Sequence, residues 1–89
     1  MVMKLIITII RDTDSDLVTQ ALTSANFRVT RVASTGGLLR KGMTTLLIGV
    51  EDHQVDKTIQ IVKENCTPSK EGEKRATIFV VPVEQFEQI

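Results

Sequence analysis

Two stretches of helical periodicity separate short β-branched runs in this chain, and this order of elements restricts the fold more than any other feature. In both stretches apolar residues recur at spacings of three and four. The residues are Val18, Ala21, Leu22 and Ala25 in the first, and Val55, Ile59, Val62 and Cys66 in the second. Such spacing places the side chains on one stripe of an amphipathic helix. We therefore expect two helices, each with one face packed on a sheet.

Four segments have the character of β-strands. The near-continuous apolar run from Leu5 to Ile10 predicts a central, buried strand. From Asn26 onward apolar and polar residues alternate, with Arg28 and Thr30 on the polar face. Residues 44–50 and 76–81 are rich in β-branched residues, and we expect Pro82 to end the last strand.

Polar residues precede both predicted helices. The cluster Asp12-Thr13-Asp14-Ser15 offers good N-cap residues to the first helix, and Asp52 offers one to the second. Pro68 is expected to stop the second helix. We expect Cys66 to pack as a small apolar residue at the end of the second stripe.

The order βαββαβ predicts an α+β, ferredoxin-like fold, with a four-stranded antiparallel sheet and both helices on one of its faces. With 89 residues the chain is expected to form a single domain, residues 1–89, close to the size at which one core is marginal. The other face of the sheet would be apolar and uncovered. We therefore expect the protein to associate through that face.

Composition disfavours several classes of partner. Lysine plus arginine equals aspartate plus glutamate, eleven each, so no overall charge attracts a nucleic-acid polymer or an anionic membrane. The apolar first ten residues are far fewer than the ~20 that span a bilayer. The single cysteine excludes an internal disulfide and fits a reducing cytoplasm.

The sequence does not favour an enzyme. Cys66 and the only histidine, His53, are separated by a predicted helix, so they do not suggest a nucleophile and its base. Asp12, Asp14 and Asp16 resemble a metal cluster, but they do not continue into a calcium-binding loop and fit a helix N-terminus better. Copper binding lacks soft or imidazole ligands near one another.

The segment between the second and third predicted strands has features of an anion-binding loop. Gly36-Gly37 can bring bare N–H groups close to a ligand, and Arg28, Arg40 and Lys41 would suit a phosphate. The alternative is that the glycines only turn a hairpin and that the basic side chains are solvated. The loop alone leaves both interpretations open.

Several separated motifs resemble the PII-like cyclic di-AMP receptor proteins, a family related in fold to the nitrogen-regulatory PII proteins. The resemblance covers nearly the whole chain. It is carried by Asp12-Thr13-Asp14-Ser15, Asn26-Phe27-Arg28-x-Thr30, Thr35-Gly36-Gly37-x-Leu39-Arg40-x-Gly42 with Thr44-Thr45, Gly49-Val50, Val55-Asp56 and Phe79-Val80-Val81-Pro82-Val83-x-x-Phe86-x-Gln88.

The resemblance implies a non-enzymatic signalling protein, a cytoplasmic homotrimer that binds cyclic di-AMP in clefts between subunits and acts on an unidentified target protein, without a cofactor or a metal. The family's ligand contacts correspond to twelve positions of this chain. They are Asn26, Arg28, Val29, Thr30, Gly36, Gly37, Leu38, Leu39, Met43, Gly49, Phe79 and Gln88.

The chain departs from the family pattern at three places. Leu38 stands where members usually have an aromatic residue, Met43 stands where they have asparagine, and the connection Thr67–Lys74 is shorter than theirs. The first two changes remove a stacking ring and a base-reading amide. The alternative function is therefore a trimeric interaction scaffold that has lost cyclic di-AMP binding or binds another adenine nucleotide, such as ATP.

Overall fold

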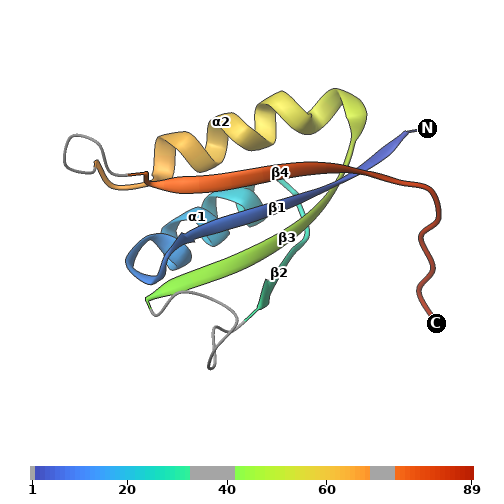
Figure 1. Cartoon of the computed structure of the whole chain (residues 1–89). Helices are drawn as coiled ribbons and strands as arrows, with labels where there is room; N and C mark the ends of the chain where they lie inside the picture. The colour runs from blue at the N-terminus through green and yellow to red at the C-terminus, as the bar shows by residue number, and fades with distance from the viewer. Residues whose placement is uncertain (1, 33–41, 69–73) are drawn as a thin grey trace.

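The computed structural model describes residues 2–32, 42–68 and 74–89 (Figure 1). Its elements follow the predicted order. They are β1 (Met3–Arg11), α1 (Asp12–Ser24), β2 (Val29–Val32), β3 (Met43–Glu51), a 3₁₀ turn (Asp52–Gln54), α2 (Val55–Asn65) and β4 (Ala76–Val83). The α+β, ferredoxin-like fold predicted from the sequence is confirmed.

The four strands form one antiparallel sheet in the order β2-β3-β1-β4. The two longest strands, β1 and β3, lie at the centre, and β2 and β4 lie on opposite edges, as Figure 1 shows. Ile7 of β1 pairs with Leu47 of β3 on one side and with Phe79 of β4 on the other. These pairs fix which side chains share a face of the sheet.

Both helices cover the same face of the sheet, and alternation along the strands divides the chain's apolar residues between the two faces. On the helix-covered face Ile6 and Ile10 of β1 and Leu46 and Ile48 of β3 are fully buried against α1 and α2. Cys66 joins this core, as predicted.

The opposite face, here called the open face, carries apolar side chains that none of the described residues covers. Leu5, Ile7 and Ile9 of β1 are only partly buried there, and Phe79 of β4 remains 53% exposed. The expected uncovered apolar face is therefore present.

Both helix starts differ from the prediction. The first helix begins at Asp12 itself, and the cap position belongs to Arg11, whose side chain makes no cap hydrogen bond. The polar cluster therefore forms the first turn, where carboxylates interact favourably with the helix dipole. Asp52 does not cap the second helix either, because a capping box between Glu51 and Gln54 starts the preceding 3₁₀ turn.

Two strand ends also differ from the prediction. Asn26 lies in a turn with a φ of 70°, and the second strand begins only at Val29. Pro82 does not end β4 but pairs with Lys4 of β1, and the strand continues to Val83. An edge strand accepts proline because one of its sides has no ladder partner that needs an N–H.

In the part of the chain that the structure describes, none of the helices has the length and apolar character needed to cross a bilayer.

Candidate functional site

Three of the predicted contact residues lie together on the open face, at the edge formed by β2 and β3. Thr30 pairs with Leu47 and Val29 with Ile48, and extending the register by one residue beyond Val29 places Arg28 opposite Gly49. Arg28, Thr30 and Gly49 are all exposed. Val29, also predicted as a contact, alternates to the other face and packs against the core.

The two arginines of this segment have different surroundings. Arg31 lies on the helix-covered side, where its Nη1 atom is 2.9 Å from the Oδ1 atom of Asp16 in α1. The extended register assigns Arg28 to the open face, and Arg28 makes no ion pair within the described residues. Its guanidinium group therefore remains available for an anionic ligand, for which the planar fork of donors is well suited.

Gly49 leaves the backbone of β3 uncovered by a side chain beside Arg28. A Cβ atom added there would meet only the Cε atom of Met3, at 4.0 Å, so the protein's own packing does not require glycine. Its missing side chain leaves space above the strand between Arg28 and Leu5, the β1 residue paired with Gly49. A flat ligand group could occupy that space.

Asn26 has a local structural role as well as a proposed binding role. Its φ of 70° is in the left-handed region, which asparagine tolerates better than most residues. Its N–H donates to the carbonyl oxygen of Thr23 at 3.0 Å, which closes the turn after α1. The next residue, Phe27, is buried and anchors the turn. The exposed residues Asn26 and Arg28 lie on either side of it in the sequence.

Within one chain, Phe79 and Met43 lie far from Arg28, Thr30 and Gly49. Phe79 shares its row of the sheet with Thr30, but β1 and β3 lie between them, a separation of about 14 Å at roughly 4.8 Å per strand. Gln88 is exposed in the tail that follows β4 (Figure 1). Met43 begins β3, about 20 Å along the strand from Gly49. One chain therefore does not gather the predicted residues into one site.

Four predicted contacts, Gly36, Gly37, Leu38 and Leu39, lie outside the described residues, as do Arg40 and Lys41. Gly42 follows them with a φ of 85°, a conformation that favours glycine. Its carbonyl oxygen accepts a hydrogen bond from the N–H of Asp12 at 2.8 Å, and the carboxylate of Asp12 accepts another from the Thr44 hydroxyl. The start of β3 is thus attached to the start of α1.

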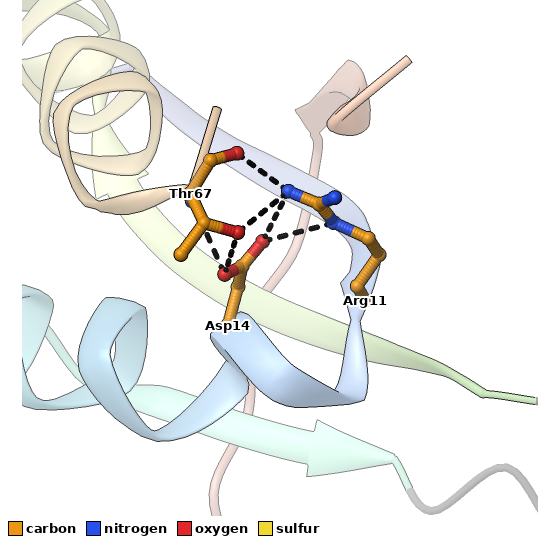
Figure 2. A network of polar contacts seen from close by, with 3 residues as sticks. All are labelled: Arg11, Asp14 and Thr67. Carbon is orange, nitrogen blue, oxygen red and sulfur yellow. Dashed lines mark hydrogen bonds and ion pairs between the residues drawn. The ribbon is translucent and has the colours of Figure 1, made fainter. Parts of the chain in front are cut away.

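A polar network around the buried carboxylate of Asp14, shown in Figure 2, connects the same corner to the segment that follows α2. The Nε atom of Arg11 donates to the Oδ2 atom of Asp14 at 3.2 Å, and its Nη2 atom donates to the Thr67 hydroxyl at 2.8 Å. The N–H and the hydroxyl of Thr67 donate to the other carboxylate oxygen of Asp14, at 3.1 and 2.9 Å. Sequence reasoning missed Arg11 and Thr67, because no local pattern connects residues so far apart along the chain.

This network determines the ionisation of Asp14, which has no exposed surface. Burial alone raises the pKa of its carboxyl group, but the hydrogen bonds from Thr67 and Arg11 outweigh burial and hold the pKa below its ordinary value. The three carboxylates near the start of α1 have separate partners: Asp12 binds Thr44, Asp14 binds Thr67 and Arg11, and Asp16 binds Arg31.

Comparisons with known proteins agree with the fold and with the motifs. The model of the cyclic-di-AMP receptor family matches residues 3–72. Among solved structures, a functionally unknown protein from Pediococcus pentosaceus has a similar structure, with a TM-score of 0.83 and 33% sequence identity. That match covers 100% of this chain and 99% of the Pediococcus protein.

Proposed function

Because this chain belongs to the cyclic-di-AMP receptor family, we propose that it is a non-enzymatic cytoplasmic signalling protein that binds cyclic di-AMP in clefts between the subunits of a homotrimer. The observation that carries the proposal is the family match over residues 3–72, together with Arg28, Thr30 and Gly49 side by side on the open face.

The distribution of the predicted contacts supports a cleft between subunits. Arg28, Thr30 and Gly49 lie near the β2 edge of the sheet, whereas Phe79 lies on β4, at the opposite edge, and Gln88 lies in the tail that follows β4. A head-to-tail arrangement of the open faces around a threefold axis would bring Arg28 and Thr30 of one subunit near Phe79 of the next, without pairing their strand edges. Two groups that are separated in one chain can then bind the same ligand.

The open face supports the trimer. Leu5, Ile7 and Phe79 lie in neighbouring strands and present apolar surface to solvent in the single chain. Burying such a patch between subunits is favourable by roughly 25 cal/mol per Å² of apolar surface. A domain of this size has little stability in reserve, so association through this face would contribute substantially to its folding.

Each side chain has a plausible chemical task in the proposed cleft. Arg28 would bind a phosphate through its charged fork of donors, and Thr30 would add a hydroxyl from the same side of β2. Asn26 and Gln88 carry carboxamides, whose adjacent donor and acceptor match the edge of adenine. The proposal also assigns ligand contacts to the segment with Gly36, Gly37, Leu38 and Leu39, and to Met43.

Calorimetric titration with cyclic di-AMP, cyclic di-GMP and ATP in parallel tests this function, and light scattering at micromolar concentration tests the assembly. We expect saturable binding of cyclic di-AMP, at one molecule per subunit, to a particle with the mass of a trimer. Binding of ATP alone, or of no nucleotide, would favour the scaffold that Leu38 and Met43 suggest. A monomeric mass would contradict the cleft between subunits.

Arg28→Ala should weaken cyclic di-AMP binding about 10- to 150-fold, because a charge-assisted hydrogen bond contributes about 1.5–3 kcal/mol. Its melting temperature should stay within a few degrees of the parent's, because Arg28 is exposed and has no ion pair within the described residues. Arg31→Ala is the matched control, since Arg31 lies on the other face and binds Asp16. Equal losses of affinity in both variants would contradict the assignment of faces.

A further inference from the structure

A groove of about 320 Å³ lies between the C-terminal part of α2 and the first residues of β4, away from the open face. The two elements lie side by side at this end of the molecule, as Figure 1 shows. The floor of the groove is aliphatic and includes Ile59 and Val62 of α2 and Ile78 of β4. Its volume is at the lower end of the range for ligand pockets, roughly 300–1,000 Å³.

The groove is lined by three cationic side chains, Lys63, Lys74 and Arg75. No carboxylate lines it within the described residues. Glu64, the neighbour of Lys63, accepts a hydrogen bond from the Nε2 atom of Gln60 at 2.7 Å, on another side of the helix. Since the chain as a whole has no net charge, the described lining of this groove is a local excess of positive charge over an apolar floor.

The groove also borders an edge of the sheet. β4 is the last strand in the order β2-β3-β1-β4 and pairs only with β1 among the described strands. An exposed strand edge can accept an extended segment of another protein through main-chain hydrogen bonds. Every second side chain of such a segment would point to the helix-covered side of the sheet, where the groove lies.

We propose that this groove binds an extended, acidic segment of a partner protein, which places an apolar side chain on the floor formed by Ile59 and Ile78 and its carboxylates beside Lys63, Lys74 and Arg75. Charge complementarity argues for an acidic partner. A nucleotide does not fit, because the described lining offers neither an aromatic ring for stacking nor an amide that reads a base. This inference does not depend on cyclic di-AMP binding.

The test uses the full-length protein and a synthetic hexapeptide with two leucines between two pairs of glutamates, blocked at both ends. A peptide with lysines in place of the glutamates is the control probe. In heteronuclear NMR titrations, we expect the acidic peptide to shift the amide signals of Ile59, Arg75 and Ile78 in a saturable way. The basic peptide should not shift them. No shifts at these residues up to millimolar acidic peptide, or equal shifts with both peptides, would overturn the proposal.

Two charge-reversal variants distinguish peptide binding in the groove from a general effect of surface charge. Lys63→Glu should weaken binding of the acidic peptide about five- to tenfold, because it replaces an attraction with a repulsion at the rim. Lys57→Glu is the matched control: Lys57 is an exposed lysine of the same helix that does not line the groove, and its variant should bind within about twofold of the parent. Equal weakening by both variants would mean that only overall charge matters, and would reject the site.

Discussion

Asp14→Asn should destabilise the protein by about 3 kcal/mol at pH 7, the largest loss of stability that we expect from a single isosteric substitution. The asparagine amide would face the donors of Arg11 instead of accepting from them, and the Arg11 charge would lose its buried partner. Breaking a buried ion pair costs about 3–5 kcal/mol of stability. Because Arg11 is 28% exposed and water can solvate part of its charge, we expect a loss at the lower end of that range. Chemical denaturation monitored by circular dichroism measures the change.

Asp16→Asn is the control for that measurement. Asp16 lies just after the first turn of α1 and also binds an arginine, but its side chain is 89% exposed. An exposed pair contributes little, so this variant should stay within about 0.5 kcal/mol of the parent. If both variants lose equal stability, the effect comes from the charge at the helix start and not from the network.

The effect of Asp14→Asn on stability should also depend on pH. Hydrogen bonds hold the pKa of Asp14 below its ordinary value in the folded state, so its stabilising contribution is fully present above the ordinary pKa of the unfolded chain. The contribution is lost as the pH falls through the lower pKa of the folded state. The difference in unfolding free energy between parent and Asp14→Asn should therefore be largest near neutral pH and shrink below about pH 4. A difference that grows on acidification would contradict the network.

Leu38→Phe combined with Met43→Asn should strengthen cyclic di-AMP binding by at least tenfold. A stacking ring and a base-reading amide each contribute about 1–3 kcal/mol, while the residues proposed to bind the phosphates, Arg28, Thr30 and Gly36-Gly37, are already in the sequence. Calorimetry on the parent, the two single variants and the double variant measures the gain and any coupling between the two sites.

Two outcomes would count against this prediction. If the parent already binds cyclic di-AMP with nanomolar affinity, the ring and the amide are not needed. If the double variant gains nothing although the parent binds, then Leu38 and Met43 do not contact the base, and the correspondence with the family is shifted through the segment between β2 and β3.

Local patterns of the sequence determined the elements, their order and the composition of the core. Spacings of three and four produced the apolar stripes of α1 and α2, and alternation assigned Arg28 and Arg31 to opposite faces of β2. These features depend on residues close together in the chain, so the sequence alone is sufficient. The motif around Arg28, which lies within the family match over residues 3–72, likewise indicated the family.

The tertiary structure decided the features that depend on contacts between distant segments. Only the position of β4 at an edge explains why Pro82 lies inside a strand, and only the approach of Thr67 to the first turn of α1 shows that Asp14 is a buried structural anion rather than a helix cap. The separation of Arg28 from Phe79 across the sheet, which supports a cleft between subunits, likewise follows from the strand order. Hydrogen bonds and strand pairing between distant segments depend on which residues the folded chain brings together, and no local pattern encodes that.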